Sequence, residues 1–383
     1  MKKRYKLLSI LLLVIIFFTG CWDKVEIENR AFIVSIAVDA LTEKNPNAST
    51  TQGIYEDTSP IMKGIFTVIS PQKLASGDPK PYEVLKSQGL NLSNIVVNLS
   101  NKFGRSPFYA HTRVFLLGEG LLKNEDAFLG TLDVNARFHE FNRQMYVVAV
   151  KGNIDEIYNT DLKLDDTPSE HIKNIIDGAE KLGSSIKLDL SSFLSSLRDN
   201  GSVLIPCIEV KNGEMTASGL AIVSDYKFQG YIPDKYIRGY ACLINRLKGG
   251  RKVVEDGNKE YSFSISSSNR RIWLVDKNKP KYRISVEMEG DLYQYSFNEE
   301  LMNPEKIEDV KKLLEDSLKL ELEEEIKYFQ NDVGKDFLGI GEYTKKYHNK
   351  FFKEHEKDWD ETFKNAEFQV DVEMFIRRIG PSR

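Results

Sequence analysis

The chain has 383 residues, a formal net charge of −4 and an apolar share of 41%. This size and composition are typical of a globular protein of two or three domains. The slightly acidic balance argues against a sequence-independent nucleic-acid surface, because such a surface needs clustered Lys and Arg. The three cysteines are too few for a disulfide framework.

The first residues have the pattern of an export signal. Four cations within residues 2–6 precede an apolar run over residues 7–18, and small residues lead to Cys21. The run is too short for a transmembrane helix, which needs about 20 apolar residues. We interpret residues 1–20 as a lipoprotein signal peptide and Cys21 as the acylated residue. An uncleaved N-terminal anchor is the alternative that stays open.

Removal of the signal makes the remaining chain more acidic. The segment 1–20 carries four cations and no anion, so the net charge falls from −4 to −8. An acidic body is not expected to adhere strongly to anionic lipid. The lipid itself must then hold the protein, and two acyl chains anchor stably where one does not. A diacylglyceryl group on Cys21 would meet this requirement.

The segment 21–202 is predicted to form an N-terminal domain of alternating strands and helices. Residues 167–170, Thr-Pro-Ser-Glu, are typical of a helix start, because Thr caps the helix and Pro suits its first position. Strands are expected at 31–39, 64–70, 113–118 and 144–150, and helices at 92–103, 125–138, 168–183 and 190–201.

The segment 203–255 is predicted to contain strands followed by one helix, and it could pack with the N-terminal domain. Strands are expected at 203–210, 218–223 and 226–232, and a helix follows from residue 234 to the glycine pair at 249–250. Cys207 and Cys242 lie in this segment. A single bridge between them and two buried free thiols are both open interpretations.

The segment 256–383 is predicted to be a C-terminal α+β domain. Residues 282–289 and 368–376 alternate apolar and polar side chains, as half-buried strands do. Between them, residues 304–333 keep helical spacing and end before Gly334. We expect a multi-domain α+β fold with mixed or antiparallel sheets, in which an antiparallel C-terminal sheet packs on this long helix. A coiled-coil or partner-binding helix is the alternative.

No motif in the sequence indicates catalysis. Metalloprotease, serine-hydrolase and Walker-type phosphate motifs are absent, and residues 339–341 lack the third Gly of a dinucleotide fingerprint. His348 and His355 could share a helix face, but no further metal ligands are spaced around them. We therefore expect a protein that is not an enzyme, with no cofactor and no metal.

Five short segments, taken in chain order, carry a resemblance to a known family. They are Gly20-Cys21-Trp22-Asp23 with Glu26-Ile27-Glu28, Ala110-His111-Thr112-Arg113-Val114 with Gly118-Glu119, Ser218-Gly219-Leu220-Ala221, Gln330 with Asp336-Phe337-Leu338-Gly339-Ile340-Gly341-Glu342, and Trp359 with Arg377-Arg378-Ile379-Gly380. Together they resemble the C subunits of spore germinant receptors, the Ger(x)C lipoprotein family. Ala37 departs from the family, whose members often carry Gly there.

The resemblance implies a non-enzymatic lipoprotein on the outer face of the cell membrane, here the inner membrane of the spore. It implies assembly with two membrane subunits, A and B, in a complex that responds to small nutrients. It does not imply which subunit contacts the nutrient. A lipoprotein solute-binding module of a transporter is the alternative function, although such modules usually have parallel sheets, and the C-terminal half has an antiparallel pattern.

The candidate site residues fall in two places. Cys21 is expected to carry the lipid. Trp22, Asp23 and Glu26 would then lie just above the membrane, where they contact a partner or serve only as a linker. His111 and Arg113 are the other candidates for partner contact, with a purely structural role for this triplet as the alternative.

Overall fold

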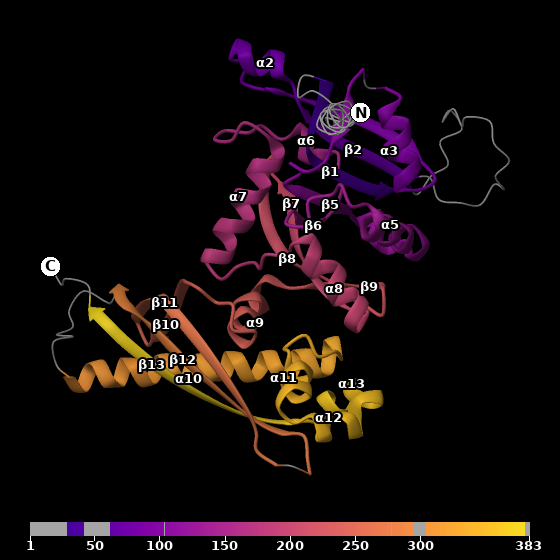
Figure 1. Ribbon diagram of the computed structural model, residues 1–383. Coiled ribbons are helices and arrows are strands. Elements are labelled where there is room, and N and C mark those ends of the chain that lie inside the picture. Colours follow the sequence, from indigo (N-terminus) through magenta and orange to yellow (C-terminus); the bar gives the residue numbers. More distant parts are fainter. Residues whose placement is uncertain (1–28, 42–61, 103, 277, 295–303, 380–383) are drawn as a thin grey trace, which may run out of the picture.

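The computed structural model describes residues 29–41, 62–102, 104–276, 278–294 and 304–379. The chain forms two domains, each built on one sheet (Figure 1). The predicted α+β, multi-domain class is confirmed. The division at residue 202 stays a prediction.

The N-terminal domain is built on a sheet of nine strands in the order β3-β2-β1-β5-β6-β7-β8-β9, with the short β4 paired to β1. Its strands are β1 (Arg30–Ala40), β2 (Met62–Ile69), β3 (Tyr82–Gly89), β4 (Ser106–Phe108), β5 (Val114–Gly118), β6 (Tyr146–Val150), β7 (Val203–Lys211), β8 (Glu214–Ser224) and β9 (Lys227–Ile232).

The centre of this sheet is parallel and its two sides are antiparallel. Strands β1, β5, β6 and β7 run parallel, while β2 and β3 on one side and β8 and β9 on the other are antiparallel hairpins. Parallel strands need crossover connections, and here helices supply them. Strands β7 to β9, from the segment 203–255, complete the sheet.

Helices cover both faces of this sheet. One face packs against α3, α4, α5 and α8, and the other packs against α6 and α7. Helix α2 contributes no buried residue. The helices are α2 (Pro71–Ser76), α3 (Leu92–Ser100), α4 (Glu119–Lys123), α5 (Glu125–Arg137), α6 (Glu156–Asn159), α7 (Pro168–Lys181) and α8 (Leu190–Asn200).

The helix starts follow the capping signals in the sequence. The Thr167 hydroxyl accepts the N–H of Glu170 at 3.2 Å, and Pro168 occupies the first turn of α7. Asp189 caps α8 in the same way, through the N–H of Ser192 at 2.7 Å. These caps satisfy amide groups that have no partner inside the helix.

The C-terminal domain is a four-stranded sheet in the order β10-β11-β12-β13, with the long helix α10 across one face. Its elements are β10 (Gly250–Asp256), β11 (Lys259–Leu274), β12 (Lys281–Gln294), α10 (Pro304–Tyr328), a π-helical turn (Phe329–Val333), α11 (Ile340–Tyr347), α12 (Asn349–His355), α13 (Trp359–Lys364) and β13 (Glu367–Ile379).

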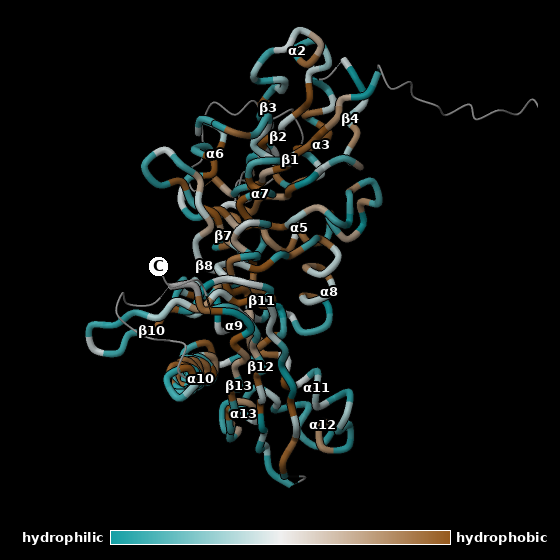
Figure 2. The backbone as a smooth tube through the Cα atoms, turned by 90° about the vertical axis from the view of Figure 1, so that its left-hand side faces the viewer, coloured by the Kyte–Doolittle hydropathy of each residue, from teal (hydrophilic) through white to brown (hydrophobic). Residues whose placement is uncertain are grey.

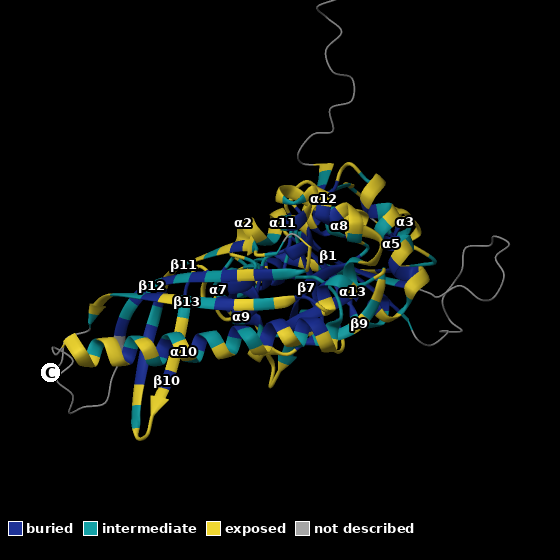
Figure 3. Cartoon of the chain, turned by 90° about the horizontal axis from the view of Figure 1, so that it is seen from below, coloured by how far each residue is buried: buried dark blue, intermediate teal, exposed yellow. Residues whose placement is uncertain are grey.

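Helix α10 covers the sheet of its own domain, as expected. Its buried stripe, which includes Leu314, Leu318 and Leu322, joins the same core as Ile284 of β12 and Val370 of β13. The opposite side of the helix is exposed along its length (Figure 3). Gly334 ends the helical run in the left-handed conformation, at φ 68°, which glycine adopts without a steric penalty.

One detail of the C-terminal sheet differs from the expectation. Strands β10, β11 and β12 are antiparallel, but β13 pairs with β12 in parallel register over its length. The sheet is therefore mixed. The reason is the connection, because α10 to α13 form a crossover that returns the chain to the end of the sheet where β12 begins.

Helix α9 (Ile237–Leu243) connects the two domains. Its apolar residues share one core with Leu220 and Ile232 of the first sheet and with Phe263 of the second. We call this shared contact the joint. Figure 2 shows α9 between the two sheets.

Cys207 and Cys242 are free and buried, so the interpretation as two free thiols is confirmed. Burial raises the pKa of both thiols to about 12, which keeps them protonated and unreactive at neutral pH.

Within the described part of the chain, no helix has the length and apolarity to cross a membrane.

Candidate functional site

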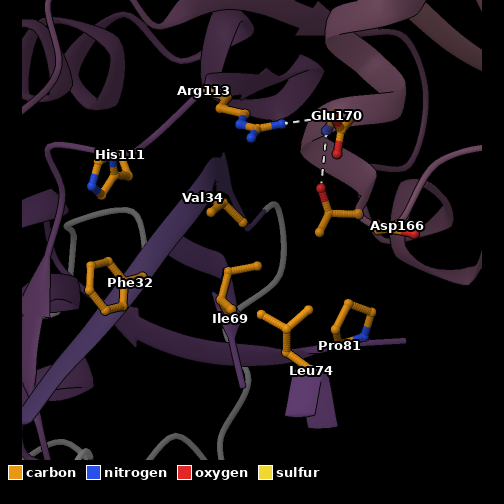
Figure 4. Close-up of a pocket in the computed structure, with 10 residues that line it drawn as sticks. Phe32, Val34, Ile69, Leu74, Pro81, His111, Arg113, Asp166 and Glu170 are labelled. Atoms are coloured by element: carbon orange, nitrogen blue, oxygen red, sulfur yellow. Dashed lines mark hydrogen bonds and ion pairs between the residues drawn. The ribbon is translucent and has the colours of Figure 1, made fainter. Parts of the chain in front are cut away.

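A cleft of about 430 Å³ lies in the N-terminal domain, between the first half of β1, α2 and the start of α7 (Figure 4). One wall is apolar and comes from β1, the end of β2, helix α2 and the residue before β3. It consists of Phe32, Val34, Ile69, Leu74 and Pro81. The volume is within the range of small-ligand pockets, and the cleft is open to solvent.

The other side of the cleft is polar and contains His111 and Arg113, the two residues of the triplet that we proposed for partner contact. His111, Arg113, Asp166, Thr167 and Glu170 line it. Arg113 Nη1 lies 3.1 Å from Glu170 Oε1. Both side chains are partly exposed, at 47% and 39%, so this ion pair is accessible from outside and contributes little to stability.

Backbone hydrogen bonds hold Arg113 in place. Its N–H donates to the carbonyl of Val34 at 2.9 Å, and its own carbonyl accepts the N–H of Tyr146 at 2.8 Å. The residue therefore lies between β1 and β6 where β5 begins. Glu170 is fixed by the first turn of α7, so the two charges come from rigid elements.

A second hollow, of about 350 Å³, lies on the far side of the same ion pair and is lined by polar residues that include Tyr146 and Lys173. Asp177 is next to it and accepts the Tyr146 hydroxyl at 2.8 Å. Burial alone would raise the pKa of Asp177, but hydrogen bonds from Lys173, Lys187 and Tyr146 lower it to about 2. The anionic form of this carboxyl is therefore stabilised.

The three residues of the His111-Thr112-Arg113 triplet have different roles. Thr112 is buried, and its hydroxyl donates to the carbonyl of Ile33 at 3.1 Å, which is a structural role. His111 and Arg113 are exposed and point to the cleft. His111 packs against Phe32 and Phe108, with ring centroids 5.8 and 5.3 Å away.

The other predicted site residues, Cys21, Trp22, Asp23 and Glu26, lie outside the described residues. The described chain begins at Asn29, next to the cleft wall residue Phe32.

The motif Gly118-Glu119 has a structural explanation. Asp39, at the end of β1, accepts the N–H groups of Ala40 at 3.0 Å and Leu121 at 2.9 Å. Burial raises the pKa of its carboxyl, and these hydrogen bonds oppose that rise. A Cβ at Gly118 would lie 2.2 Å from Asp39 Cγ, so only glycine leaves room for this contact.

The motif of residues 336–342 is also structural. The buried carboxylate of Asp336 accepts the N–H groups of Leu338, Ile340 and Gly341, at 3.1, 3.2 and 2.6 Å. It also accepts Trp359 Nε1 at 3.0 Å. Asp336 thus ties the turn after α10 to the start of α13, and this explains why the same resemblance includes Trp359.

Sequence reasoning missed Asp166 and Glu170 as cleft residues. The capping pattern at residues 167–170 marked this segment as a helix start, but nothing local indicated its contact with Arg113.

Among the described residues, no group of three or more His, Cys, Asp or Glu side chains is arranged to hold a metal ion.

Two family descriptions match the chain along almost its whole length. Residues 23–210 match "Spore germination protein N-terminal domain" and residues 218–380 match "Spore germination B3/GerAC like, C-terminal". The chain is 25% identical to spore germination protein KC of Bacillus subtilis (strain 168), covering 99% of this chain and 97% of the relative. It is 23% identical to spore germination protein B3 of the same organism, covering 97% of each.

The fold is also similar to a solved structure. The crystal structure of the GerBC protein aligns with a TM-score of 0.59 and 19% identity, covering 84% of this chain and 96% of that one. This similarity confirms the fold, and the family matches extend through both domains. The chain therefore belongs to the GerAC-like family of spore germination proteins, the C-subunit family that its sequence resembles.

Proposed function

We propose that this protein is the lipid-anchored C subunit of a germinant receptor, which assembles with the A and B membrane subunits and triggers germination in response to nutrients. The observation that carries the proposal is the family match through both domains, from residue 23 to residue 380. The family is non-enzymatic, so the role is one of assembly and signalling.

The anchor in this proposal is a diacylglyceryl group on Cys21, at the outer face of the inner spore membrane. The signal-like pattern of residues 1–20 supports it, because that pattern ends at this cysteine. The acidic charge of the rest of the chain also supports a lipid anchor, since electrostatic adhesion to anionic lipid would be weak.

The proposed contact with the membrane subunits includes Trp22, Asp23 and Glu26 together with His111 and Arg113. The short distance along the chain supports this grouping, because Cys21 precedes the cleft residue Phe32 by eleven positions. A membrane partner could therefore contact both.

Deletion of the gene tests the receptor role. In a strain without paralogous C subunits, we expect spores lacking this protein to lose the response to at least one nutrient in a panel. Expression of the intact protein should restore that response. An unchanged response to every nutrient would contradict the proposal.

The anchor is tested separately by Cys21→Ala. In cells without the A and B subunits, we expect the variant to leave the membrane fraction, where the intact protein stays, because no acyl chain holds it. Mass spectrometry of the mature protein reports the lipid directly. A mature N-terminus without an acyl group would show that the anchor assignment is wrong.

A further inference from the structure

We infer that the end of the N-terminal domain formed by α2, the start of β1 and β4 lies against the lipid bilayer, with Leu74 as its apolar contact. We call these three elements the anchor end. The inference rests on the proposed lipid at Cys21, and it goes further by assigning a surface and an orientation.

The first argument is the length of the tether. The chain from Cys21 to Asn29 spans at most about 28 Å even when fully extended. Asn29 directly precedes Arg30, the first residue of β1. In the proposed anchored state the start of β1 therefore lies within about 28 Å of the lipid. Figures 1 and 2 both place α2 at the end of the molecule farthest from the C-terminal domain.

The second argument is the chemistry of α2. None of its residues is buried, and Leu74 is 60% exposed. The helix is nevertheless held firmly, because the Ser70 N–H donates to the Pro81 carbonyl at 2.9 Å and Gly77 closes the helix with φ 71°. Leu74 lines the open cleft and belongs to no buried core cluster. A firmly held, exposed Leu of this kind fits contact with the boundary between headgroups and acyl chains.

The third argument is the group of rings and cations beside it. The Arg30 guanidinium lies 4.5 Å from the centroid of the Phe108 ring, and Phe32 is 5.6 Å from the same ring. All three side chains are only partly buried. Aromatic rings with a neighbouring cation are typical of the membrane–water interface, where the ring is apolar and the charged group stays in water.

Two of the cations at this end are paired with carboxylates. Lys73 Nζ lies 2.8 Å from Glu83 Oε1, and Arg113 pairs with Glu170. We therefore take Leu74 and the neighbouring rings, rather than these two cations, as the contact with lipid. It should form on zwitterionic phosphatidylcholine as well as on anionic lipid, and it should resist salt.

The experiment compares two positions of matched exposure at opposite ends of the molecule. Leu74 is 60% exposed on α2, and Leu320 is 62% exposed on α10 of the C-terminal domain. Each is changed to Cys in the full acylated chain, labelled with an environment-sensitive fluorophore and reconstituted into phosphatidylcholine vesicles with quenchers on the acyl chains. The native thiols Cys207 and Cys242 are buried and are not expected to react.

We expect the label of Leu74→Cys to be quenched and blue-shifted, and the label of Leu320→Cys to behave as in buffer. Equal quenching of the two labels, or no quenching at residue 74, would overturn the inference. A blue shift of the label at residue 74 that appears only after the A and B subunits are added would also overturn the inference, because the surface would then contact protein.

The outcomes separate this inference from the proposed anchor. If mass spectrometry finds no acyl group on Cys21, the anchor is wrong, whatever the labels report. If the acyl group is present and residue 74 remains in water, only the orientation is wrong.

Discussion

Glu325 has an unfavourable environment for a carboxyl group. It is 1% exposed on α10, and neither carboxyl oxygen has a hydrogen-bond partner in the described part of the chain. A Cβ at Gly239 of α9 would lie 1.7 Å from Glu325 Oε2, so the carboxyl group packs directly on that glycine. Burial, with a smaller effect of Glu321, raises the pKa of Glu325 well above its usual range.

This environment predicts a pH-dependent stability. In the unfolded chain the carboxyl ionises near pH 4.3, roughly the ordinary value for Glu. The folded protein keeps the proton to a much higher pH, so the unfolding free energy falls as pH rises, by about 1.4 kcal/mol per unit between the two pKa values. Glu325→Gln should remove this slope and stabilise the protein at pH 7, as measured by urea unfolding between pH 5 and 8.

The control for this prediction is the neighbouring residue. Glu324 is exposed on the same turn of α10, and Glu324→Gln should leave the slope unchanged. If the unfolding free energies of Glu325→Gln and of the unmodified protein change in parallel with pH, the buried carboxyl does not titrate as described.

At the scale of elements, the segment after α10 is held by side chains rather than by regular structure. Asp336 binds the turn into α11 and reaches Trp359 of α13. Gln330 Nε2 donates to the carbonyls of Phe363 and Ala366, at 2.8 and 3.0 Å. These two polar residues fix the helices α11 to α13 against the end of the long helix, because buried backbone groups need such partners.

Asp336→Ala should therefore destabilise the C-terminal domain by about 3 kcal/mol, since it leaves several buried N–H groups without an acceptor. Asp336→Asn should cost less, because its amide oxygen still accepts hydrogen bonds. Urea unfolding measures the loss, and a red shift of the tryptophan emission reports the release of Trp359. Equal losses for the two variants would contradict the hydrogen-bond explanation, because Asn keeps both the side-chain volume and an acceptor oxygen.

The elements that the sequence predicted well are those with local signals. The cap at Thr167 and the stop at Gly334 depend on adjacent residues, so the start of α7 and the end of the helical run that follows α10 could be predicted directly. Strand β11 was not predicted, because the polar run at residues 266–271 interrupts the alternation that begins at residues 261–265. The parallel pairing of β13 depends on a whole crossover and could not be read locally.

The candidate site also depends on a contact between distant segments, which leaves no local signal in the sequence. His111 and Arg113 stood out because they interrupt the approach to a buried strand. Their partner Glu170 could not be identified, because the contact joins two crossovers of the first sheet that are distant in sequence. For Cys207 and Cys242 the sequence left a bridge and two free thiols open, and the structure has two free thiols.

At the scale of the whole molecule, α7 and α9 connect the cleft to the C-terminal domain. The first turn of α7 contains the cleft residue Glu170. Near the other end of α7, the buried Glu180 pairs with Lys187 at 3.1 Å and lies 3.4 Å from Arg246, which follows α9. A Cβ at Gly250 would lie 2.5 Å from the Leu182 carbonyl. The two domains thus meet through close backbone contacts as well as through the joint.

This arrangement predicts that the domains are coupled in stability. Leu220→Ala removes a fully buried side chain of the joint and should cost about 3 kcal/mol. Hydrogen exchange should then accelerate in β12 of the second domain as well as in the first sheet. Leu99→Ala, in the core of the first domain only, is the control and should leave β12 protected. Unchanged exchange of β12 in Leu220→Ala would show that the joint does not couple the domains.

The parallel pairing of β13 with β12 has a consequence for biosynthesis. The register joins Lys281 to Glu367 and Leu292 to Ile379, so the core of the C-terminal domain depends on contacts between segments far apart in sequence. Such contacts form slowly, because a long loop must close first. If the chain crosses the membrane from its N-terminus, as proposed, β13 emerges last. The edge of β12 that pairs with β13 then remains open to extracytoplasmic chaperones and proteases until residue 379 has been translocated.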